Sequence, residues 1–462
     1  MKIFWNLNGK IHLVPEQLLE FLNENGFFNY RESYETTTKL IRKQKNILNH
    51  VSINEIKRFI WDYVNTQEFE DSNEKCQVLD LIFNLILTNQ KVAVLKILDN
   101  LRFIEDSKEY AVVYFKKGPF VIDKSRVQKI GGQIPLIWRS QIINFHFNNI
   151  ERYRLSKWSF NSFLRNISRD RITGEPNEDN YNSLKSLIEY LLVTYKNKAC
   201  NPAVIIRDIP RNDNPEGSSG KGILYEALSQ IRKTIKEDGK TQNPDTRFVF
   251  SRVTSEVRIL VFDDVKKNFS FENLFSAITE DLVVEEKNFG KYSIPFEKSP
   301  KILITSNYPI DGEGKSHDRR RFEFIISDYY NNVRTPKSEF GKTFFSEWDY
   351  EEWLCFYYTM FDCIMFFLEN GLVKQKLTPA GYNYITETTM DFRKFANSKF
   401  VAGEKYYTKG LHSEFISSIP SHRHIEQYAF TQWIKLFAQS AGFEIVNGHS
   451  GNDSYFQFTK LE

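Results

Sequence analysis

The sequence predicts an α/β fold in which a parallel sheet carries a phosphate-binding loop, with a helical N-terminal region before it and a C-terminal winged helix after it. Three apolar runs in the middle of the chain indicate the sheet. Residues 203–206 precede a glycine-rich loop with a lysine, residues 259–262 precede two aspartates, and residues 301–304 precede Thr-Ser-Asn. Such runs are typical of strands buried on both faces, and the polar residues after them would meet at one edge of the sheet.

Composition places the chain among ordinary globular proteins. Its 462 residues correspond to about two to four domains, and 41% apolar with 26% charged residues is the usual balance. The net charge of +3 excludes a strong global field, so any nucleic-acid contact depends on local basic patches. Four scattered cysteines without metal-ligand spacing fit a reducing compartment. With no secretory segment or membrane span apparent, we expect a cytoplasmic protein with no membrane partner.

Residues 1–130 are predicted to form a mixed α/β domain. Helical spacing occurs at 15–22, 53–64 and 78–87, and residues 111–122 are typical of a hairpin. The hairpin carries several basic side chains that suit phosphate, with a solvated turn as the alternative: Lys116, Lys117, Lys124, Arg126 and Lys129.

Residues 131–200 are predicted to be a helical collar or linker. Basic residues interleaved with aromatics suit a nucleic-acid backbone, and a solvated basic helix face explains them equally well. These residues are Arg152, Arg154, Lys157, Arg165, Arg169 and Arg171.

The glycine-rich loop opens the central domain, predicted at 201–330. Backbone N–H groups of such a loop, followed by a helix N-terminus, bind phosphates, and Lys221 would reach the β- and γ-phosphates. The usual pattern has glycine where Pro215 stands and a Mg²⁺-binding hydroxyl where Gly222 stands. A surface turn is the alternative. The residues predicted to bind nucleotide are Gly217, Ser218, Ser219, Gly220, Lys221, Gly222 and Ile223.

The other two strand ends supply the predicted chemistry. Asp263 is assigned to Mg²⁺ and Asp264 to the attacking water, because carboxylates at this edge can hold a metal shell and orient a nucleophile. Asn307 is predicted to hydrogen-bond the water or the γ-phosphate. Aspartate and Ser-Asn are also common in ordinary strand-to-loop transitions.

Two further segments suggest partners. Residues 283–296 are typical of a hairpin whose tip, Lys287, Phe289 and Lys291, suits single-stranded DNA by charge and ring stacking. A purely structural hairpin is the alternative. The cluster Arg319, Arg320 and Arg321 would neutralise phosphoryl charge from a neighbouring subunit, or else lies on a solvated loop.

The remainder divides into two predicted parts. Residues 331–400 form a helical segment packing on the central domain, with a long apolar helix within 348–372. Residues 401–462 form the winged helix, from helices at 411–419 and 430–441 and strands at 443–446 and 455–458. The wing would contact DNA or pack against a neighbour.

This order of motifs resembles the superfamily 3 helicases, in particular the poxvirus- and phage-type primase-helicases. The similarity lies in residues 217–222 as Walker A, 259–264 as Walker B, the 287–291 hairpin tip, 302–307 as motif C and 319–321 as the arginine region. It implies an AAA+-like P-loop motor using ATP and Mg²⁺, a homo-oligomeric ring (commonly a hexamer), and 3′-to-5′ movement on single-stranded or forked DNA. A primase or other replication proteins would be partners.

Three functions therefore remain open from the sequence. The first is an ATP-dependent DNA helicase in replication of a phage, virus or mobile element. The second is a DNA-remodelling or loader ATPase that does not unwind DNA. The third is a non-catalytic DNA-binding scaffold whose loop has decayed at Gly222.

Overall fold

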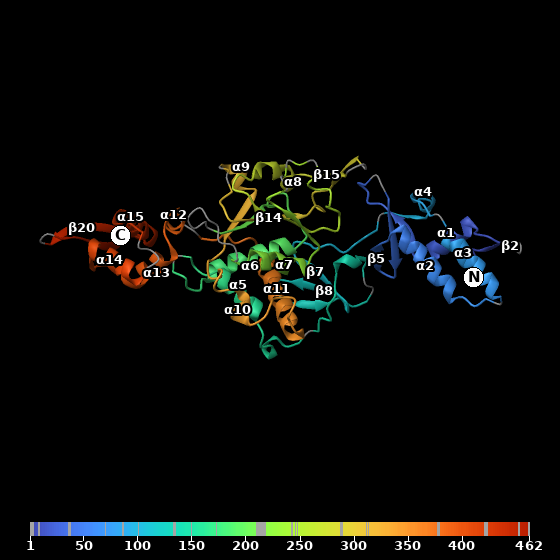
Figure 1. The fold of residues 1–462 in the computed structure, drawn as a ribbon, viewed down its shortest axis with the longest axis horizontal. Coiled ribbons are helices and arrows are strands. Elements are labelled where there is room, and N and C mark those ends of the chain that lie inside the picture. Colours follow the sequence, from blue (N-terminus) through green and yellow to red (C-terminus); the bar gives the residue numbers. More distant parts are fainter. Residues whose placement is uncertain are drawn as a thin grey trace.

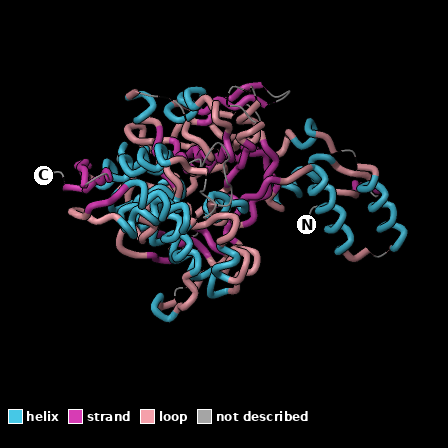
Figure 2. Tube along the Cα trace, turned by 60° about the vertical axis from the view of Figure 1, so that its left-hand side comes forward, coloured by secondary structure: helices cyan, strands magenta, loops and turns pink. Residues whose placement is uncertain are grey.

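The computed structural model is an elongated molecule with the N-terminal region at one end and the C-terminal elements at the other (Figure 1). Figure 2 shows strands running through the central body with helices packed around them. The structure describes residues 4–7, 10–35, 38–69, 71–85, 87–99, 101–132, 135–148, 150–171, 173–208, 219–241, 244, 246, 248–286, 290–310, 312, 314–376, 379–419, 424–450 and 453–460.

The N-terminal region contains sheets as well as helices, in agreement with the mixed α/β domain predicted for residues 1–130; the broader description of a helical N-terminal region is too narrow. The helices predicted at 15–22 and 53–64 and the hairpin are confirmed, whereas the helix predicted at 78–87 lies at 72–83. The short strands, which alternate weakly in hydrophobicity, were missed. The elements are β1 (Asn6–Leu7), β2 (Lys10–Ile11), α1 (Pro15–Glu24), β3 (Phe27–Tyr30), β4 (Lys39–Gln44), β5 (Ile47–His50), α2 (Ile53–Thr66), α3 (Ser72–Phe83), α4 (Asn89–Val92), β6 (Ile97–Leu98), β7 (Tyr110–Phe115), β8 (Gly118–Asp123) and β9 (Val127–Lys129).

The segment 131–200 is helical only in its second half. Its first half adds short strands to the two preceding sheets, giving the orders β10-β5-β4-β3-β6 and β11-β7-β8-β9. The collar prediction is therefore wrong for residues 137–143, where pairing with distant strands overrides local composition. The elements are β10 (Ile137–Trp138), η1 (Arg139–Gln141), β11 (Ile142–Ile143), η2 (Arg152–Arg154), α5 (Ser159–Ile167) and α6 (Glu178–Leu192).

The centre of the molecule is a five-stranded sheet in the order β13-β14-β17-β12-β18, and every neighbouring pair is parallel. The three predicted strands therefore lie in one sheet with their carboxyl ends at the same edge. The elements are β12 (Ala203–Arg207), α7 (Lys221–Ser229), β13 (Thr234–Asp238), β14 (Ile259–Val265), η3 (Phe271–Leu274), α8 (Phe275–Thr279), β15 (Leu282–Glu286), β16 (Gly290–Ile294), β17 (Lys301–Ser306), α9 (Lys315–Asp318) and β18 (Arg321–Ile325).

Both faces of this sheet are buried, as the apolar runs predict. Successive side chains of a strand point to opposite faces. Val204 and Ile206 accordingly join the core formed with α5, α6, α7 and α11 (Tyr350–Asn370). Ala203 and Ile205 join a second core with η3, α8 and the β15–β16 hairpin. Burial on both faces holds each strand in position, and this places the polar residues at the strand ends.

The long apolar helix α11 packs along α6. It begins at a capping box on Asp349 and ends at Gly371, whose φ is 67°. The carboxyl group of Glu189, fully buried on α6, accepts a hydrogen bond at Oε2 from the Phe367 backbone N–H at 2.6 Å. Burial raises the pKa of Glu189 to about 11, so this carboxyl group is protonated at neutral pH. None of the helices within the described ranges is long and apolar enough to cross a bilayer.

The C-terminal elements appear in the predicted order of two helices and a hairpin. The two hairpin strands and one further strand form a sheet in the order β19-β21-β20. Arg393, only 1% exposed, joins this part to the centre through an ion pair with Asp328 at 3.3 Å, and Arg171 lies 3.8 Å from the same carboxylate. The elements are α10 (Pro336–Phe340), α12 (Pro379–Glu387), α13 (Met390–Lys399), β19 (Lys405–Tyr407), α14 (Thr408–Ser418), α15 (Gln427–Ala441), β20 (Phe443–Ser450) and β21 (Asp453–Lys460).

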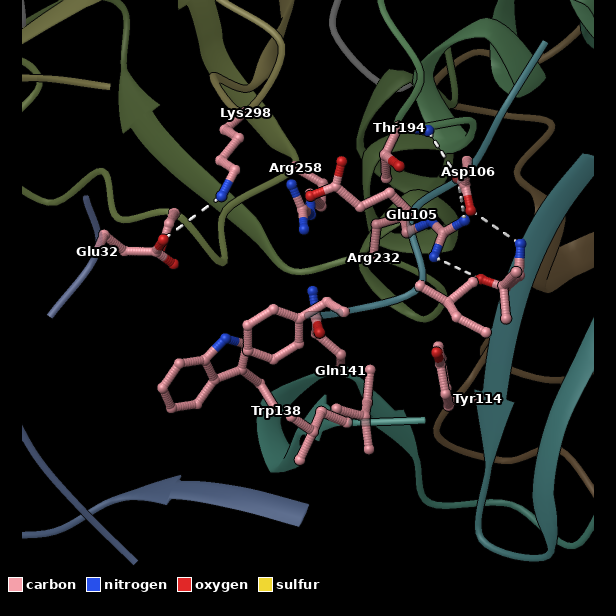
Figure 3. A pocket seen from close by; sticks show the side chains of 16 residues that line it. Glu32, Glu105, Asp106, Tyr114, Trp138, Gln141, Thr194, Arg232, Arg258 and Lys298 are labelled. Atoms are coloured by element: carbon pink, nitrogen blue, oxygen red, sulfur yellow. Dashed lines mark hydrogen bonds and ion pairs between the residues drawn. The ribbon is translucent and has the colours of Figure 1, made fainter. Parts of the chain in front are cut away.

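A polar seam joins the N-terminal region to the central sheet (Figure 3). Asp106 accepts hydrogen bonds from the backbone of Val112 and Thr194 and pairs with Arg232 at 2.8 Å, while Lys298 lies 3.4 Å from Glu32. The cavity between these groups measures about 40 Å³. That volume admits water and is far below the ~300 Å³ of the smallest usual ligand pockets, so the seam is a structural contact.

Candidate nucleotide site

The lysine of the glycine-rich loop lies at the carboxyl edge of the central sheet. Gly217 and Ser218 fall outside the described residues, while Ser219 onward is described. Gly220 precedes α7 with a φ of 99°, and a Cβ there would lie 2.9 Å from the ring of Phe163. Only glycine tolerates both constraints, so the turn that presents Lys221 depends on this residue.

Asp208, which the sequence reasoning missed, holds that lysine. It follows β12 directly, and its carboxylate pairs with the Lys221 ammonium and accepts a hydrogen bond from the Ser219 hydroxyl at 3.0 Å. The Asp208 and Lys221 side chains are 13% and 11% exposed. The signal that singles out Asp263, an acid at the end of an apolar run, applies equally to Asp208.

The paired aspartates of β14 lie at an irregularity of the strand. The register against β17 shifts between Phe262 and Val265, and Asp264 has a φ of 54°. A positive φ is costly for aspartate, and a bulge re-aims the side chains of a strand. Thr305 stabilises this conformation, because its hydroxyl donates to Asp263 Oδ1 at 2.6 Å and accepts from the Asp264 N–H at 2.8 Å.

Asn307 connects the lysine to the acids. Its Oδ1 accepts from Lys221 Nζ at 2.8 Å, and its Nδ2 donates to Asp264 Oδ1 at 2.7 Å. One amide thus contacts residues that follow β12 and β14, the strands on either side of β17. The structure therefore brings Lys221, Asp263, Asp264 and Asn307 into one hydrogen-bonded group.

Two further lysines, from β13 and the turn after it, also reach the acids. Lys236 Nζ lies 3.2 Å from Asp263 Oδ2, and Lys240 pairs with Asp264 Oδ2. Burial lowers the pKa of Lys236, but the hydrogen bond to Asp263 outweighs it and the net shift is upward; the bond to Asp264 raises the pKa of Lys240. The sequence reasoning missed both lysines because the edge strand β13 is too polar to predict.

These groups compensate one another's charge. Three carboxylates, Asp208, Asp263 and Asp264, face three ammonium groups, Lys221, Lys236 and Lys240. A phosphate chain that recruits Lys221 must therefore displace Asp208, and a cation that recruits the β14 acids must displace lysines. Within the described residues, no cluster of three His, Cys, Asp or Glu side chains is arranged to hold a metal alone.

The predicted DNA-contacting hairpin exists as β15 and β16, paired antiparallel from Leu282↔Ile294 to Glu286↔Gly290. Lys287 and Phe289 at its tip lie outside the described residues. Lys291 is 62% exposed and pairs with Glu285 at 3.2 Å. Leu282, Val284 and Ile294 root the hairpin in the core beneath the sheet.

The arginine cluster lies at the opposite edge of the sheet from Lys221. Arg321 is paired in register with Ala203 at the start of β12, about 13 Å from the level of Arg207 at its end. Arg320 lies over the Phe275 ring at 4.5 Å, and Arg321 lies 3.5 Å from Asp318. Arg319 is exposed, and its side chain forms no hydrogen bond or ion pair with another described residue. None of the three reaches this chain's own site.

Comparison with known proteins gives distant structural similarities. No family model and no curated protein sequence matches the chain. Among solved structures, the A form apo structure of the NrS-1 C-terminal region has a TM-score of 0.39 at 11% identity, covering 95% of this chain and 98% of that chain. A second structure of that region gives 0.34 at 14%, covering 96% and 98%. Drosophila ORC bound to DNA gives 0.21 at 8%, covering 68% and 92%. All three TM-scores are below 0.5.

Proposed function

We propose that this chain is an ATP-dependent DNA helicase of the superfamily 3 type, acting as a ring in DNA replication. The observation that carries the proposal is the convergence of three strand ends on one group of side chains, linked through Asn307 to Lys221 at 2.8 Å and to Asp264 at 2.7 Å. A phosphate-binding lysine, an amide and a strand-terminal acid within one hydrogen-bonded chain are what nucleotide hydrolysis requires.

Each residue has a role in this proposal. Lys221 leaves Asp208 to bind the β- and γ-phosphates, and the backbone at Ser219 to Ile223 cradles them. Asp264 orients the attacking water, and Asn307 senses whether the γ-phosphate is present. Arg319, the exposed member of the cluster, stabilises the developing charge in the site of a neighbouring subunit.

The oxygen donors at the strand ends fit Mg²⁺, which retains several waters and binds through one or two carboxylates and substrate phosphates. Asp263 would hold the ion, with the Thr305 hydroxyl 2.6 Å from its Oδ1 fixing the carboxylate. When bound, the ion supplies positive charge to the phosphate oxygens.

Hydrolysis and unwinding test the proposal with separate variants. We expect Lys221→Ala and Asp264→Asn to lower DNA-stimulated ATP hydrolysis at least 100-fold, because each removes charge stabilisation or water positioning. Lys267→Ala, an exposed lysine after β14, is the matched control and should retain full activity. Strand displacement on a forked duplex should disappear together with hydrolysis. Unchanged hydrolysis in Lys221→Ala would refute the proposal.

A non-catalytic DNA-binding scaffold is the second candidate. It is favoured by the ion pair that already occupies Lys221 and by the absence of a hydroxyl at Gly222. This candidate predicts DNA binding without any turnover of ATP by the wild-type protein. DNA-stimulated hydrolysis excludes it, and hydrolysis without strand displacement selects the loader ATPase instead.

A further inference from the structure

Two basic segments precede the central domain in the sequence, and they differ in whether their charges are paired in the structure. The basic side chains between Arg152 and Arg171 are paired with groups of this chain, several of them at the surface. Arg152 pairs with Asp362, Lys157 with Asp349 and Arg165 with Glu178. Arg169 donates to Gly174 O at 3.1 Å and lies over the Tyr329 ring at 4.8 Å. This segment is therefore structural.

The lysines of the β7–β9 sheet behave differently. Lys116 and Lys117 form the β7–β8 turn, and Lys129 lies opposite Phe120 at the same end of the sheet. All three are exposed. Lys116 and Lys129 form no ion pair with any described residue, and Lys117 reaches only the neutral Asn148 Oδ1 at 3.5 Å. The one carboxylate in the sequence between Lys116 and Lys129, Asp123 at the end of β8, pairs with Arg126 at the other end of the sheet.

Two of these lysines, Lys117 and Lys129, border a groove. A hollow of about 450 Å³ lies between Lys117 and Lys129. Its lining joins apolar and polar groups: Phe120, Val127, Phe147, Gln128 and Asn148. Ammonium groups beside apolar and amide surface match a nucleic-acid strand, which presents phosphates on one side and sugars and bases on the other.

We infer that this groove, bordered by Lys117 and Lys129 with Lys116 next to Lys117 in the β7–β8 turn, is a second binding site for single-stranded DNA, separate from the motor hairpin. The inference rests on the proposed action on DNA and extends it to the N-terminal region. Figure 1 places β8 and the β15 hairpin on opposite sides of the central body, so one strand bound at both would run along its outside. The site would retain DNA while the motor contacts are released.

Salt dependence of binding tests the site. Binding of fluorescein-labelled oligo(dT) to the full chain is measured at salt concentrations from about 0.05 to about 0.5 M. The slope of log K against log salt then reports the number of phosphate contacts, because each contact releases counterions. Removing three phosphate contacts with Lys116→Ala, Lys117→Ala and Lys129→Ala together should reduce the slope of log K against log salt by about 2 and weaken binding about 100-fold at 0.1 M salt. Lys124→Ala, at the opposite end of the sheet, should leave the slope unchanged.

Each outcome decides the inference. An unchanged slope in the triple variant, or an equal loss in Lys124→Ala and Lys129→Ala, overturns it; equal losses would indicate only a diffuse charge effect. Loss of binding to a poly-glutamate probe with oligo(dT) binding retained would assign the groove to an acidic protein segment instead. A wild-type protein without DNA-stimulated hydrolysis would refute the proposed function. Normal wild-type hydrolysis with an unchanged slope would refute only this groove. Thermal unfolding of the triple variant checks that the sheet remains folded.

Discussion

The ion pair between Asp208 and Lys221 leads us to predict that removing the charge of Asp208 changes the affinity for nucleotide. Asp208→Asn keeps the shape of the side chain and its hydrogen bond to Ser219, but removes the negative charge that competes with phosphate for the lysine. We therefore expect the variant to bind ATP more tightly than the wild type. The prediction concerns the free energy of nucleotide binding and not the stability of the fold.

The magnitude follows from burial of the pair. The two side chains are 11% and 13% exposed, so solvent screens them little. A hydrogen bond to a charged group is worth about 1.5–3 kcal/mol, and each 1.4 kcal/mol is about tenfold in affinity. Because asparagine still accepts weakly from the lysine, the tightening should be at least about tenfold.

Displacement of a fluorescent ATP analogue, with Mg²⁺ and with chelator, measures the effect. Tightening should appear in both conditions, since the competition involves the lysine and phosphate. Asp80→Asn, an exposed carboxylate on α3, is the control and should leave affinity unchanged. Weaker binding that appears only with Mg²⁺ would refute the reasoning and make Asp208 a ligand of the ion.

Three further predictions concern the loop and the buried charges. Gly220→Ala should abolish nucleotide binding because its Cβ would lie 2.9 Å from the Phe163 ring. Gly222→Ser has no atom within 4 Å of its Cβ, so it should fold normally and raise Mg²⁺-dependent hydrolysis. Equal effects of the two variants in an ATPase assay would contradict this. Asp328→Asn should lower the free energy of unfolding by about 3–5 kcal/mol in urea, because it leaves Arg393 and Arg171 without their shared carboxylate, while Asp62→Asn at an exposed pair should change it by less than about 0.5 kcal/mol. Glu189→Gln should flatten the pH dependence of stability. The folded pKa of about 11 lies above the unfolded value, so the contribution of Glu189 to the free energy of unfolding is full below about pH 4.5 and decreases by about 1.4 kcal/mol per pH unit as pH rises toward 11. Parallel stability curves for the two proteins between pH 7 and 9 would count against the protonated carboxyl group.

The sequence predicts best where burial is two-sided. The runs at 203–206, 259–262 and 301–304 carry their apolar character without interruption, so β12, β14 and β17 and the polar residues after them follow directly. The edge strand β13 reads Thr-Ile-Lys-Glu-Asp and has no such pattern, so neither Lys236 in the strand nor Lys240 in the turn after it could be predicted as part of the site. The positive φ of Asp264 is stabilised by the hydrogen bond from its N–H to the Thr305 hydroxyl, and nothing in the sequence next to Asp264 predicts it.

Charge pairing across the chain could not be predicted either. Lys157 and Asp349 are 192 residues apart, and nothing local to Lys157 indicates that its charge is already balanced. The basic stretch and the β7–β8 lysines therefore look equally available in the sequence. Only the fold shows that the first is satisfied and the second is not.

Strand β17 has a mechanical consequence for any motion of the hairpin. It carries Asn307 just beyond its carboxyl end and follows the β15–β16 hairpin at its amino end, while β12 and β14 hold it by hydrogen bonds on both sides. Sliding it by one position would break both ladders at once and turn its side chains to the wrong faces. The strand therefore cannot slide along its own axis relative to β12 and β14. A movement of the hairpin relative to β17 is confined to the connection at residues 295–300, whereas a movement together with β17 needs the whole sheet to rotate as one body; a rotation of about 10° would carry the far end of the ~13 Å hairpin arms by about 2 Å.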